Sequence, residues 1–365
     1  MVDINAMKKG MQKKADAAPA GAGPRDLLGS GSTLLNLACT NKPYGAFQKG
    51  KYYLFVGDSQ SGKTFLALTC MAEASISKHF KDYRIIYDNV EDGALMDIRR
   101  FFGDAVAERL EAPSAAGCSK TVEEFYYNVD DAIKDGRPFI YVEDSMDALE
   151  AEEAAETFDA RKAASRKGKE GPGSYGMAKP KLNSMYLPRI ISGLKETNSI
   201  LIIISQTRAN IGPMATRVPK TRSGGHSLKF YATLEIWSSV KETLKRHVKG
   251  KDRKIGILSK VQIKKNRISG RDRTVEVPIY YTVGVDDIGS CVDYLVAEGH
   301  WKKAGGGIAA PEFELTLTRE KLIDAIEQQN LERQLRMLVG EVWNDIEEAC
   351  AVKRKSRYAE KPDEE

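Results

Sequence analysis

Short apolar runs recur along the first two thirds of the chain, and segments long enough to hold a helix separate them. Each run is four or five residues long, rich in aromatic and β-branched side chains, and bounded by polar residues. Such runs are typical of strands that are buried on both faces. Their alternation with helical segments predicts a parallel sheet covered by helices, with strands at Tyr52–Val56, Arg84–Tyr87, Phe139–Val142 and Ile200–Ile204.

The pattern changes in the last third of the chain. Leu234–Val240, Gly256–Ile263 and Thr274–Thr282 follow one another without long helical segments, which predicts antiparallel strands that extend one edge of the sheet. Glu320–Glu348 carries apolar residues at helical spacing and predicts one or two helices. The expected fold class is α/β: a mostly parallel sheet covered by helices, an antiparallel extension, a short N-terminal arm and a small helical C-terminal region.

Composition indicates a folded protein, and its charges are clustered. Of the 365 residues, 42% are hydrophobic and 29% charged, and the net charge is only +5. Residues 241–273, however, hold thirteen Lys or Arg against three acids, and residues 208–229 hold five against none. The five cysteines are scattered, and neither a membrane span nor a secretory pattern is present. We expect a cytoplasmic protein with reduced thiols and no membrane partner.

One motif has a direct chemical meaning: residues 57–64 match the P-loop pattern G-x-x-x-x-G-K-[ST]. It follows the strand at Tyr52–Val56 and precedes the helical stretch Phe65–Ser77, so its context rules out a chance match in a glycine-rich turn. Backbone N–H groups of such a loop surround phosphates, its lysine reaches the terminal phosphates and its threonine binds Mg²⁺. The motif predicts an ATP and Mg²⁺ site formed by Gly57, Asp58, Ser59, Gln60, Ser61, Gly62, Lys63 and Thr64.

Two carboxylates are candidates for the same site. Asp144 comes at the end of the strand at Phe139–Val142 and is expected to hold the metal-bound water. The alternative is that Asp144 caps a following helix, and the presence of the P-loop favours the metal role over this alternative. Glu91 follows the strand at Arg84–Tyr87 and is a candidate for activating the attacking water. Asp88 and Asp92 compete for that role, and spacing alone equally allows a solvated acidic turn.

The order of the motifs resembles the RecA family, including its phage-encoded members. The resemblance covers about residues 27–300. Its most specific motif is the string at 224–232, because many ATPase families share a P-loop. The motifs that carry it, besides the P-loop and the Glu91 loop, are Leu28-Gly29-Ser30-Gly31-Ser32, Val142-Glu143-Asp144-Ser145, Ile204-Ser205-Gln206-Thr207-Arg208 and Gly224-Gly225-His226-Ser227-Leu228-Lys229-Phe230-Tyr231-Ala232.

The resemblance implies roles for particular side chains. Glu91 would act on the hydrolytic water, and Gln206 would sense the γ-phosphate; the alternative for Gln206 is a buried amide satisfied by backbone. Lys265 and Arg267 would reach across a subunit interface to the neighbouring ATP, near Phe230. The alternative is that Lys265 and Arg267 are charges on an edge strand that prevent its aggregation. With Lys63, these residues complete the expected catalytic set.

Two segments match the DNA-binding loops of the family. They lie at about residues 151–181 and 208–225, after consecutive core strands, and both are basic. Taken alone, either could be a solvated surface loop. The residues expected to contact DNA are Met177, Lys179, Lys181, Arg208, Ile211, Arg217, Lys220, Arg222, Gly224 and Gly225.

The resemblance implies a DNA-dependent ATPase: a recombinase that forms helical filaments on single-stranded DNA and pairs it with homologous duplex DNA during recombination and repair. Loading or single-strand-binding proteins are expected partners, and the compartment would be the cytoplasm of a bacterium or a phage-infected bacterium. The alternatives are a ring helicase with the same core and a non-recombining ATPase switch or mediator. The expected division is an arm and linker at 1–26 that contacts another protomer, an ATPase core at 27–300, and a C-terminal helical region with an acidic tail at 301–365.

Overall fold

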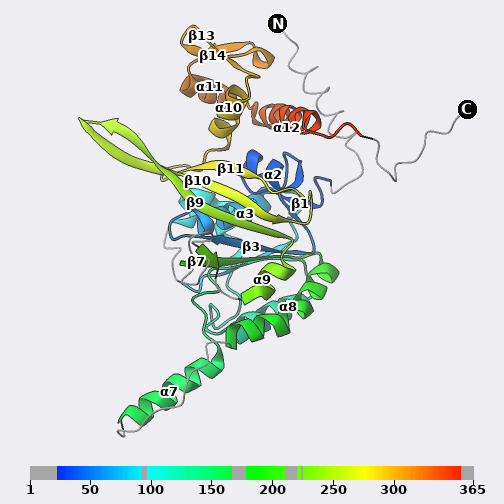
Figure 1. Ribbon diagram of the computed structural model, residues 1–365, viewed down its shortest axis with the longest axis vertical. Helices are drawn as coiled ribbons and strands as arrows, with labels where there is room; N and C mark the ends of the chain where they lie inside the picture. The colour runs from blue at the N-terminus through cyan, green and yellow to red at the C-terminus, as the bar shows by residue number, and fades with distance from the viewer. Residues whose placement is uncertain (1–22, 92–96, 167–177, 210–219, 223–224, 355–365) are drawn as a thin grey trace, which may run out of the picture.

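A computed structural model describes residues 23–91, 97–166, 178–209, 220–222 and 225–354 (Figure 1). The sequence correctly predicts the α/β class. Each apolar run forms a central strand, and these strands are parallel to one another. The central strands are β3 (Lys51–Gly57), β4 (Arg84–Asp88), β6 (Phe139–Glu143) and β7 (Ile200–Ala209).

The main sheet has the strand order β12-β11-β10-β9-β3-β7-β6-β4-β5, and β8 (Lys220–Arg222) pairs with β7 outside this path. Strand β9 (Leu234–Val248) is parallel to β3, whereas the next three pairings are antiparallel. The antiparallel extension is therefore where the sequence predicts it. It consists of β9, β10 (Lys251–Asn266), β11 (Thr274–Tyr280) and β12 (Gly284–Val285), while β5 (Leu110–Glu111) forms the other edge.

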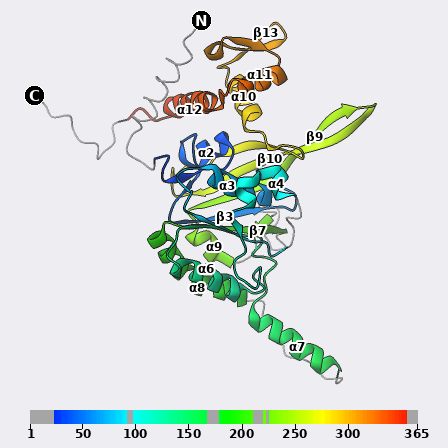
Figure 2. The same cartoon turned by 180° about the vertical axis from the view of Figure 1, so that it is seen from behind.

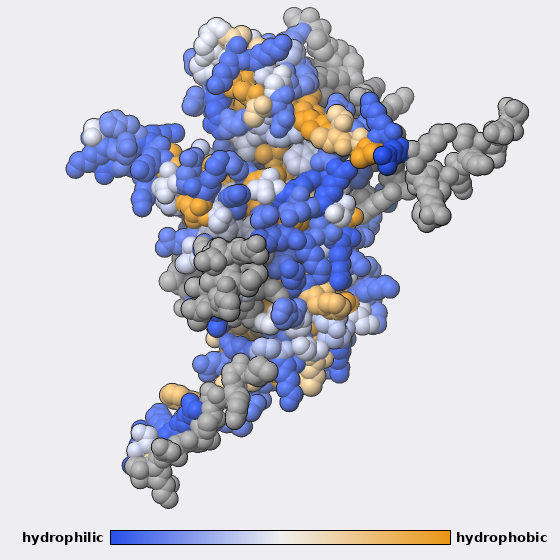
Figure 3. Space-filling view, viewed as in Figure 1, coloured by the Kyte–Doolittle hydropathy of each residue, from blue (hydrophilic) through white to orange (hydrophobic). Residues whose placement is uncertain are grey.

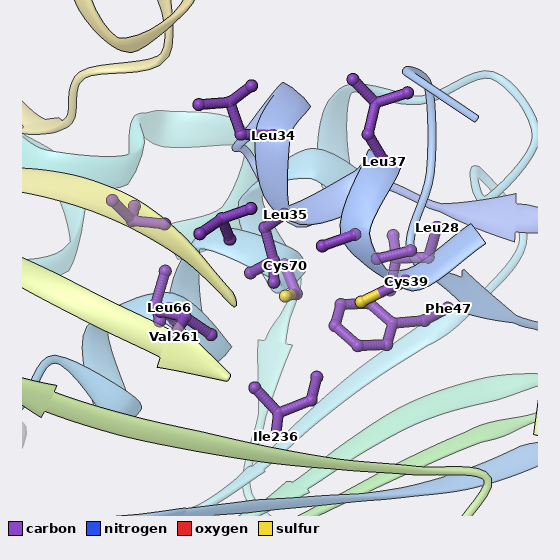
Figure 4. Close-up of a cluster of buried hydrophobic side chains, with 14 of the residues drawn as sticks. Leu28, Leu34, Leu35, Leu37, Cys39, Phe47, Leu66, Cys70, Ile236 and Val261 are labelled. Atoms are coloured by element: carbon purple, nitrogen blue, oxygen red, sulfur yellow. The ribbon is translucent and has the colours of Figure 1, made fainter. Parts of the chain in front are cut away.

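Successive residues of a strand point to opposite sides of the sheet, so a strand that is apolar throughout presents apolar side chains on both faces. Helices cover both of these faces. Tyr53 and Phe55 of β3 belong to one buried cluster, and Leu54 and Val56 belong to the other. Figure 4 shows the first cluster, in which α2 and α3 side chains pack over β9 and β10. Full burial of each large apolar side chain contributes about 1.5–3 kcal/mol. The second cluster lies under α6, α8 and α9.

Local sequence fixes where several helices begin. Ser32 and Thr121 accept hydrogen bonds from backbone N–H groups at the starts of α2 and α6, as N-cap residues do. The helices of this body are α2 (Thr33–Thr40), α3 (Lys63–Ile76), α4 (Ile98–Phe102), α5 (Asp104–Ala107), α6 (Val122–Lys134), α8 (Ala178–Thr197) and α9 (Gly225–Tyr231). A separate two-stranded sheet joins β1 (Leu27–Leu28) to β2 (Phe47–Gln48).

The first expected DNA-binding loop is largely helical. Residues Glu152–Arg166 form α7, which projects away from the sheet (Figures 1 and 2). Ala, Glu, Lys and Arg have high helix propensity, so a segment rich in them forms a helix without an apolar face. The expectation of a loop across 151–181 is therefore wrong for residues 152–166. Residues 167–177 lie outside the described ranges.

The C-terminal region holds the expected helices and one unexpected sheet. Helix α10 (Asp287–Ala297) contacts β11 and the helices α11 (Arg319–Gln328) and α12 (Glu332–Ala349). Three short antiparallel strands, β13 (Lys302–Ala304), β14 (Gly307–Ala310) and β15 (Leu315–Leu317), pair beside α11, with the turn η1 (Pro311–Phe313) between the last two. Among the described residues, no helix is both long and apolar enough to cross a membrane.

Candidate nucleotide and nucleic-acid site

The P-loop connects the end of β3 to the start of α3. Gly57 ends β3 and lies opposite Gln206 of β7 on one side and Ser238 of β9 on the other. A Cβ atom at Gly57 would collide with Ser238 and would lie 2.7 Å from Ser61 Oγ. Gly62 has φ +92°, a left-handed conformation that favours glycine. Both motif glycines are therefore required by the backbone itself.

Lys63 is the first residue of α3, and its side chain is buried. Its Nζ donates to the carbonyl oxygens of Gly57 and Asp58 at 2.9 and 2.7 Å, so the ammonium group lies across the loop. Burial lowers the pKa of Lys63, and the nearby carboxylates, Asp144 foremost and then Glu91, oppose that shift. The side chain is a cation held among acidic groups at the C-terminal edge of the sheet.

Asp144 lies next to this cation. It follows β6, is almost fully buried, and accepts a hydrogen bond from the Tyr87 hydroxyl at 2.9 Å. Burial raises the pKa of Asp144, whereas hydrogen bonds with Thr64 and Tyr87 lower it. The next helix begins only at Glu152, so Asp144 does not cap it.

Glu91 and Gln206 meet at the same edge. The Gln206 side-chain Nε2 donates to Glu91 Oε1 at 2.7 Å, and the Glu91 N–H donates to the Asp144 carbonyl at 3.2 Å. Asp88, the competing carboxylate, is fully buried and accepts hydrogen bonds from Ser119 and Tyr141. These bonds tie Asp88 to the protein interior and leave Glu91 as the more accessible of the two.

Asp147 connects this site to both expected DNA-binding segments. Its Oδ2 accepts hydrogen bonds from the Gln206 N–H at 2.6 Å and from the Ser205 hydroxyl at 2.9 Å. Arg208 Nη2 lies 3.8 Å from Asp147 Oδ1, and Lys179 Nζ donates to the Asp147 carbonyl at 3.1 Å. The Asp147 carboxylate therefore orders the end of β7 and lies near Arg208, while the Asp147 backbone carbonyl binds Lys179.

The two segments also touch at their C-terminal ends. Gly225 has φ +81°, and a Cβ atom there would lie 2.9 Å from Pro180 Cβ. Lys181, beside Pro180, is exposed on α8. For Lys220 and Arg222 the structure describes only the backbone, in β8, paired with β7. The remaining predicted contacts lie outside the described residues: Met177, Ile211, Arg217 and Gly224.

Lys265 and Arg267 contact the backbone of α9 in their own chain. Lys265 Nζ donates to the carbonyls of Lys229 and Phe230, and Arg267 Nη2 donates to that of Phe230. Lys265 pairs with Glu235, near the start of β9, and Glu235 pairs with Leu54 of β3, three residues before Gly57. Strand β10 is paired with β9 on one side and, over Gly256–Gln262, with β11 on the other. The exposed ring of Phe230 lies beside Arg267.

A pocket of about 570 Å³ opens beside the P-loop. Gln60 to Phe65 form one wall, and Phe101, Tyr280 and Tyr281 contribute aromatic rings. The three aromatic residues come from parts of the chain that no single motif includes.

Two buried acids were also missed from the sequence. Asp147 has no motif of its own, and its importance follows only from its partners. Glu143 precedes Asp144 and is fully buried, and neither of its carboxyl oxygens has a hydrogen-bond partner among the described residues. Burial, and then the neighbouring acids, raise the pKa of Glu143 well above its ordinary value.

The residues present fit a magnesium nucleotide. Thr64 and Asp144 would supply oxygen ligands, which Mg²⁺ prefers, at the foot of a loop whose glycine at 57 leaves no room for a side chain. Mg²⁺ keeps several waters and binds substrate phosphates, so it needs few protein ligands. The described residues hold no cluster of three or more acidic, histidine or cysteine ligands.

The sheet order, the P-loop and the acidic groups at its edge define a P-loop NTPase core of the RecA-like type. Comparison with known proteins agrees: the family model described as the RecA N-terminal domain matches residues 164–286. The chain is therefore similar to RecA proteins, at low sequence identity.

The relatives are bacterial proteins named Protein RecA. That of Chloroherpeton thalassium is 28% identical over 279 residues, which make up 76% of this chain and 70% of the relative. One from Thermus thermophilus is 26% identical over 325 residues, 88% of this chain and 86% of the relative. The similarity therefore extends well beyond the nucleotide motif.

Proposed function

We propose that this chain is an ATP-dependent DNA recombinase that forms filaments on single-stranded DNA and promotes homologous pairing and strand exchange. The observation that carries the proposal is the position of Gln206. Its side chain bonds to Glu91 at the nucleotide site, and its backbone lies at the root of the basic segment 208–225. A change at the γ-phosphate can therefore be passed directly to a segment suited to gripping DNA phosphates.

The chain's own residues would divide the chemistry as follows. Lys63 would bind the terminal phosphates, and Phe101, Tyr280 and Tyr281 would hold the base in the adjacent pocket. Glu91, held by Gln206, would orient the attacking water. When bound through Thr64 and Asp144, Mg²⁺ would neutralise phosphate charge.

The positions of Lys265 and Arg267 support assembly. Within one chain both cations donate hydrogen bonds to backbone carbonyls of α9. A role in ATP hydrolysis would then be exerted on a neighbouring subunit, whose phosphates such cations can stabilise. Head-to-tail stacking of protomers, with Phe230 near the contact, would produce either an open filament or a closed ring.

Electron microscopy of the full chain with single-stranded DNA and a non-hydrolysable ATP analogue tests the proposal. We expect helical filaments, and we expect labelled single strands to form joint molecules with homologous but not heterologous duplex. Six-membered rings would instead indicate a helicase. Nucleotide binding without assembly or joint molecules would indicate a switch or mediator.

A further inference from the structure

The β9–β10 hairpin continues far beyond the sheet that supports it. Strand β11 pairs with β10 only over Gly256–Gln262, so residues 245–255 form a ribbon of two strands with no third strand beside it. Figures 1 and 2 show this ribbon projecting from the body. A two-stranded ribbon without further packing is marginally stable, so its length serves little purpose in stabilising the fold.

The projecting ribbon is strongly basic. Residues 241–254 hold seven Lys or Arg and two acidic residues. All the charged side chains of this stretch are exposed, and Figure 3 shows a hydrophilic surface over the projection. Two ion pairs involve the stretch, Lys241 with Glu276 and His247 with Asp252. In the described part of the chain, the other six cations form no ion pair.

Like charges face one another across the ribbon. Lys245 pairs with Lys254 and Arg246 with Arg253, so two successive cross-strand pairs juxtapose cations. Like charges directly opposite one another destabilise a hairpin. An anionic partner bound to the ribbon would relieve this repulsion.

One face of the ribbon is suited to that partner. Residues directly opposite share a face, and alternate residues along each strand return to it. Arg246, Lys251 and Arg253 therefore share a face with Val248 and Leu244, and this face carries no acid over 244–248 and 251–256. It presents three cations with no competing carboxylate.

We infer that the face formed by Arg246, Lys251 and Arg253 binds the phosphate backbone of duplex DNA. A two-stranded β-ribbon has the width to enter the major groove, whereas a single strand offers no groove. The contacts would be to phosphates, so they would position the duplex without reading its sequence. This site would be additional to segments 151–181 and 208–225, and it rests on the proposed function in taking DNA as the partner.

The test compares matched variants of the full chain on labelled duplex DNA over a series of salt concentrations. Arg246→Gln/Lys251→Gln/Arg253→Gln removes three charges from the face. We expect weaker duplex binding and a slope of log affinity against log salt that is shallower by about 2.7, from about 0.9 per lost phosphate contact. The control Lys78→Gln/Lys81→Gln/Lys195→Gln removes three exposed charges elsewhere and should leave both values unchanged.

Further measurements keep the inference distinct from the proposed function. Arg246→Lys/Arg253→Lys should retain the wild-type slope, and the triple glutamine variant should retain filaments on single-stranded DNA and its ATP turnover. Wild-type duplex affinity and slope in the triple variant would overturn the inference. A change in self-association alone, with unchanged duplex binding, would also overturn it and would indicate an acidic protein surface as partner. Absence of filaments in the wild-type chain would instead contradict the proposed function.

Discussion

Gln206 donates a hydrogen bond from its side-chain amide to Glu91 over 2.7 Å, between the ends of two strands that β6 separates in the sheet. The bond joins the residue proposed to sense the γ-phosphate to the residue proposed to orient water. Either group could exchange this partner for a nucleotide oxygen or a water, because an amide both donates and accepts. The pair can therefore adopt different partners with and without ATP.

Shortening Gln206 should uncouple DNA from hydrolysis. In Gln206→Ala we expect single-stranded DNA to lose its stimulation of ATP turnover, with a fall on the order of 10²-fold, as for removal of one oriented donor. Nucleotide affinity should change little, because Lys63 and the loop remain. Turnover with and without DNA, beside a nucleotide-binding titration, measures both. Gln328→Ala, an exposed position on α11, is the control, and undiminished stimulation in Gln206→Ala would contradict the coupling.

Lys63→Ala should abolish ATP turnover. The ammonium group lies buried across the loop and has no replacement there. We expect turnover to fall to background, with weaker nucleotide binding, because a charge-assisted contact to phosphate is lost. A coupled ATPase assay measures turnover. Lys78→Ala, an exposed lysine just beyond α3, should retain activity; substantial turnover in Lys63→Ala would refute the P-loop assignment.

Features that depend on local pattern were predicted well from the sequence. The runs that became β3 and β7 are continuous and apolar because both faces of the sheet are covered, and this leaves a clear record in the sequence. The P-loop is likewise local: its glycines and lysine act through backbone geometry within eight residues. Lys63 and Thr64 could therefore be proposed as nucleotide-site residues before any fold was known.

Features without a local pattern were missed. Helix α7 buries almost none of its side chains, so it has no apolar periodicity and resembled a low-complexity loop. Asp147 gains its position from Gln206 and Lys179, which are 59 and 32 residues away along the chain. The small sheet β13–β15 has strands of three or four residues, too short for alternation to be recognised.

Asp147 should couple the two basic segments to the nucleotide site. Asp147→Ala removes the acceptor of the Gln206 N–H and the Ser205 hydroxyl, leaving polar groups unsatisfied at a cost of about 1–3 kcal/mol. We expect lower stability in urea unfolding, and reduced stimulation of ATP turnover by DNA. Asp147→Asn, which keeps one acceptor oxygen, should lie between. If both variants match the exposed control Asp131→Asn, Asp147 has no such role.

The second basic segment should grip single-stranded DNA through phosphates. Arg217→Ala/Lys220→Ala should weaken binding and make the salt dependence shallower by roughly 1.4, from about 0.7 per contact to a single strand. Fluorescence anisotropy of a labelled oligonucleotide over a salt series measures both. The charge-matched control is Lys78→Gln/Lys81→Gln. Affinity and slope equal to the wild-type values would remove this segment from the DNA site.

Glu73 of α3 should make stability depend on pH. Burial raises the pKa of Glu73 above its ordinary 4.5, Arg336 opposes the shift and Asp287 adds to it. Asp286, Glu327 and Glu332 line the same pocket. Because the folded chain holds the proton more tightly than the unfolded chain, the resulting stabilisation is complete below pH 4.5. It is lost as pH rises through the raised folded-state value.

Glu73→Gln removes this titration and leaves the other acids in place. We therefore expect the free energy of unfolding of the wild-type chain, relative to Glu73→Gln, to be highest near pH 4 and to decline as pH rises toward 8. Urea unfolding of both proteins at several pH values gives the difference directly, and because the other groups titrate in both proteins, their contributions largely cancel. A difference that stayed constant, or rose with pH, would mean that Arg336 outweighs burial and that the carboxyl is ionised in the folded chain.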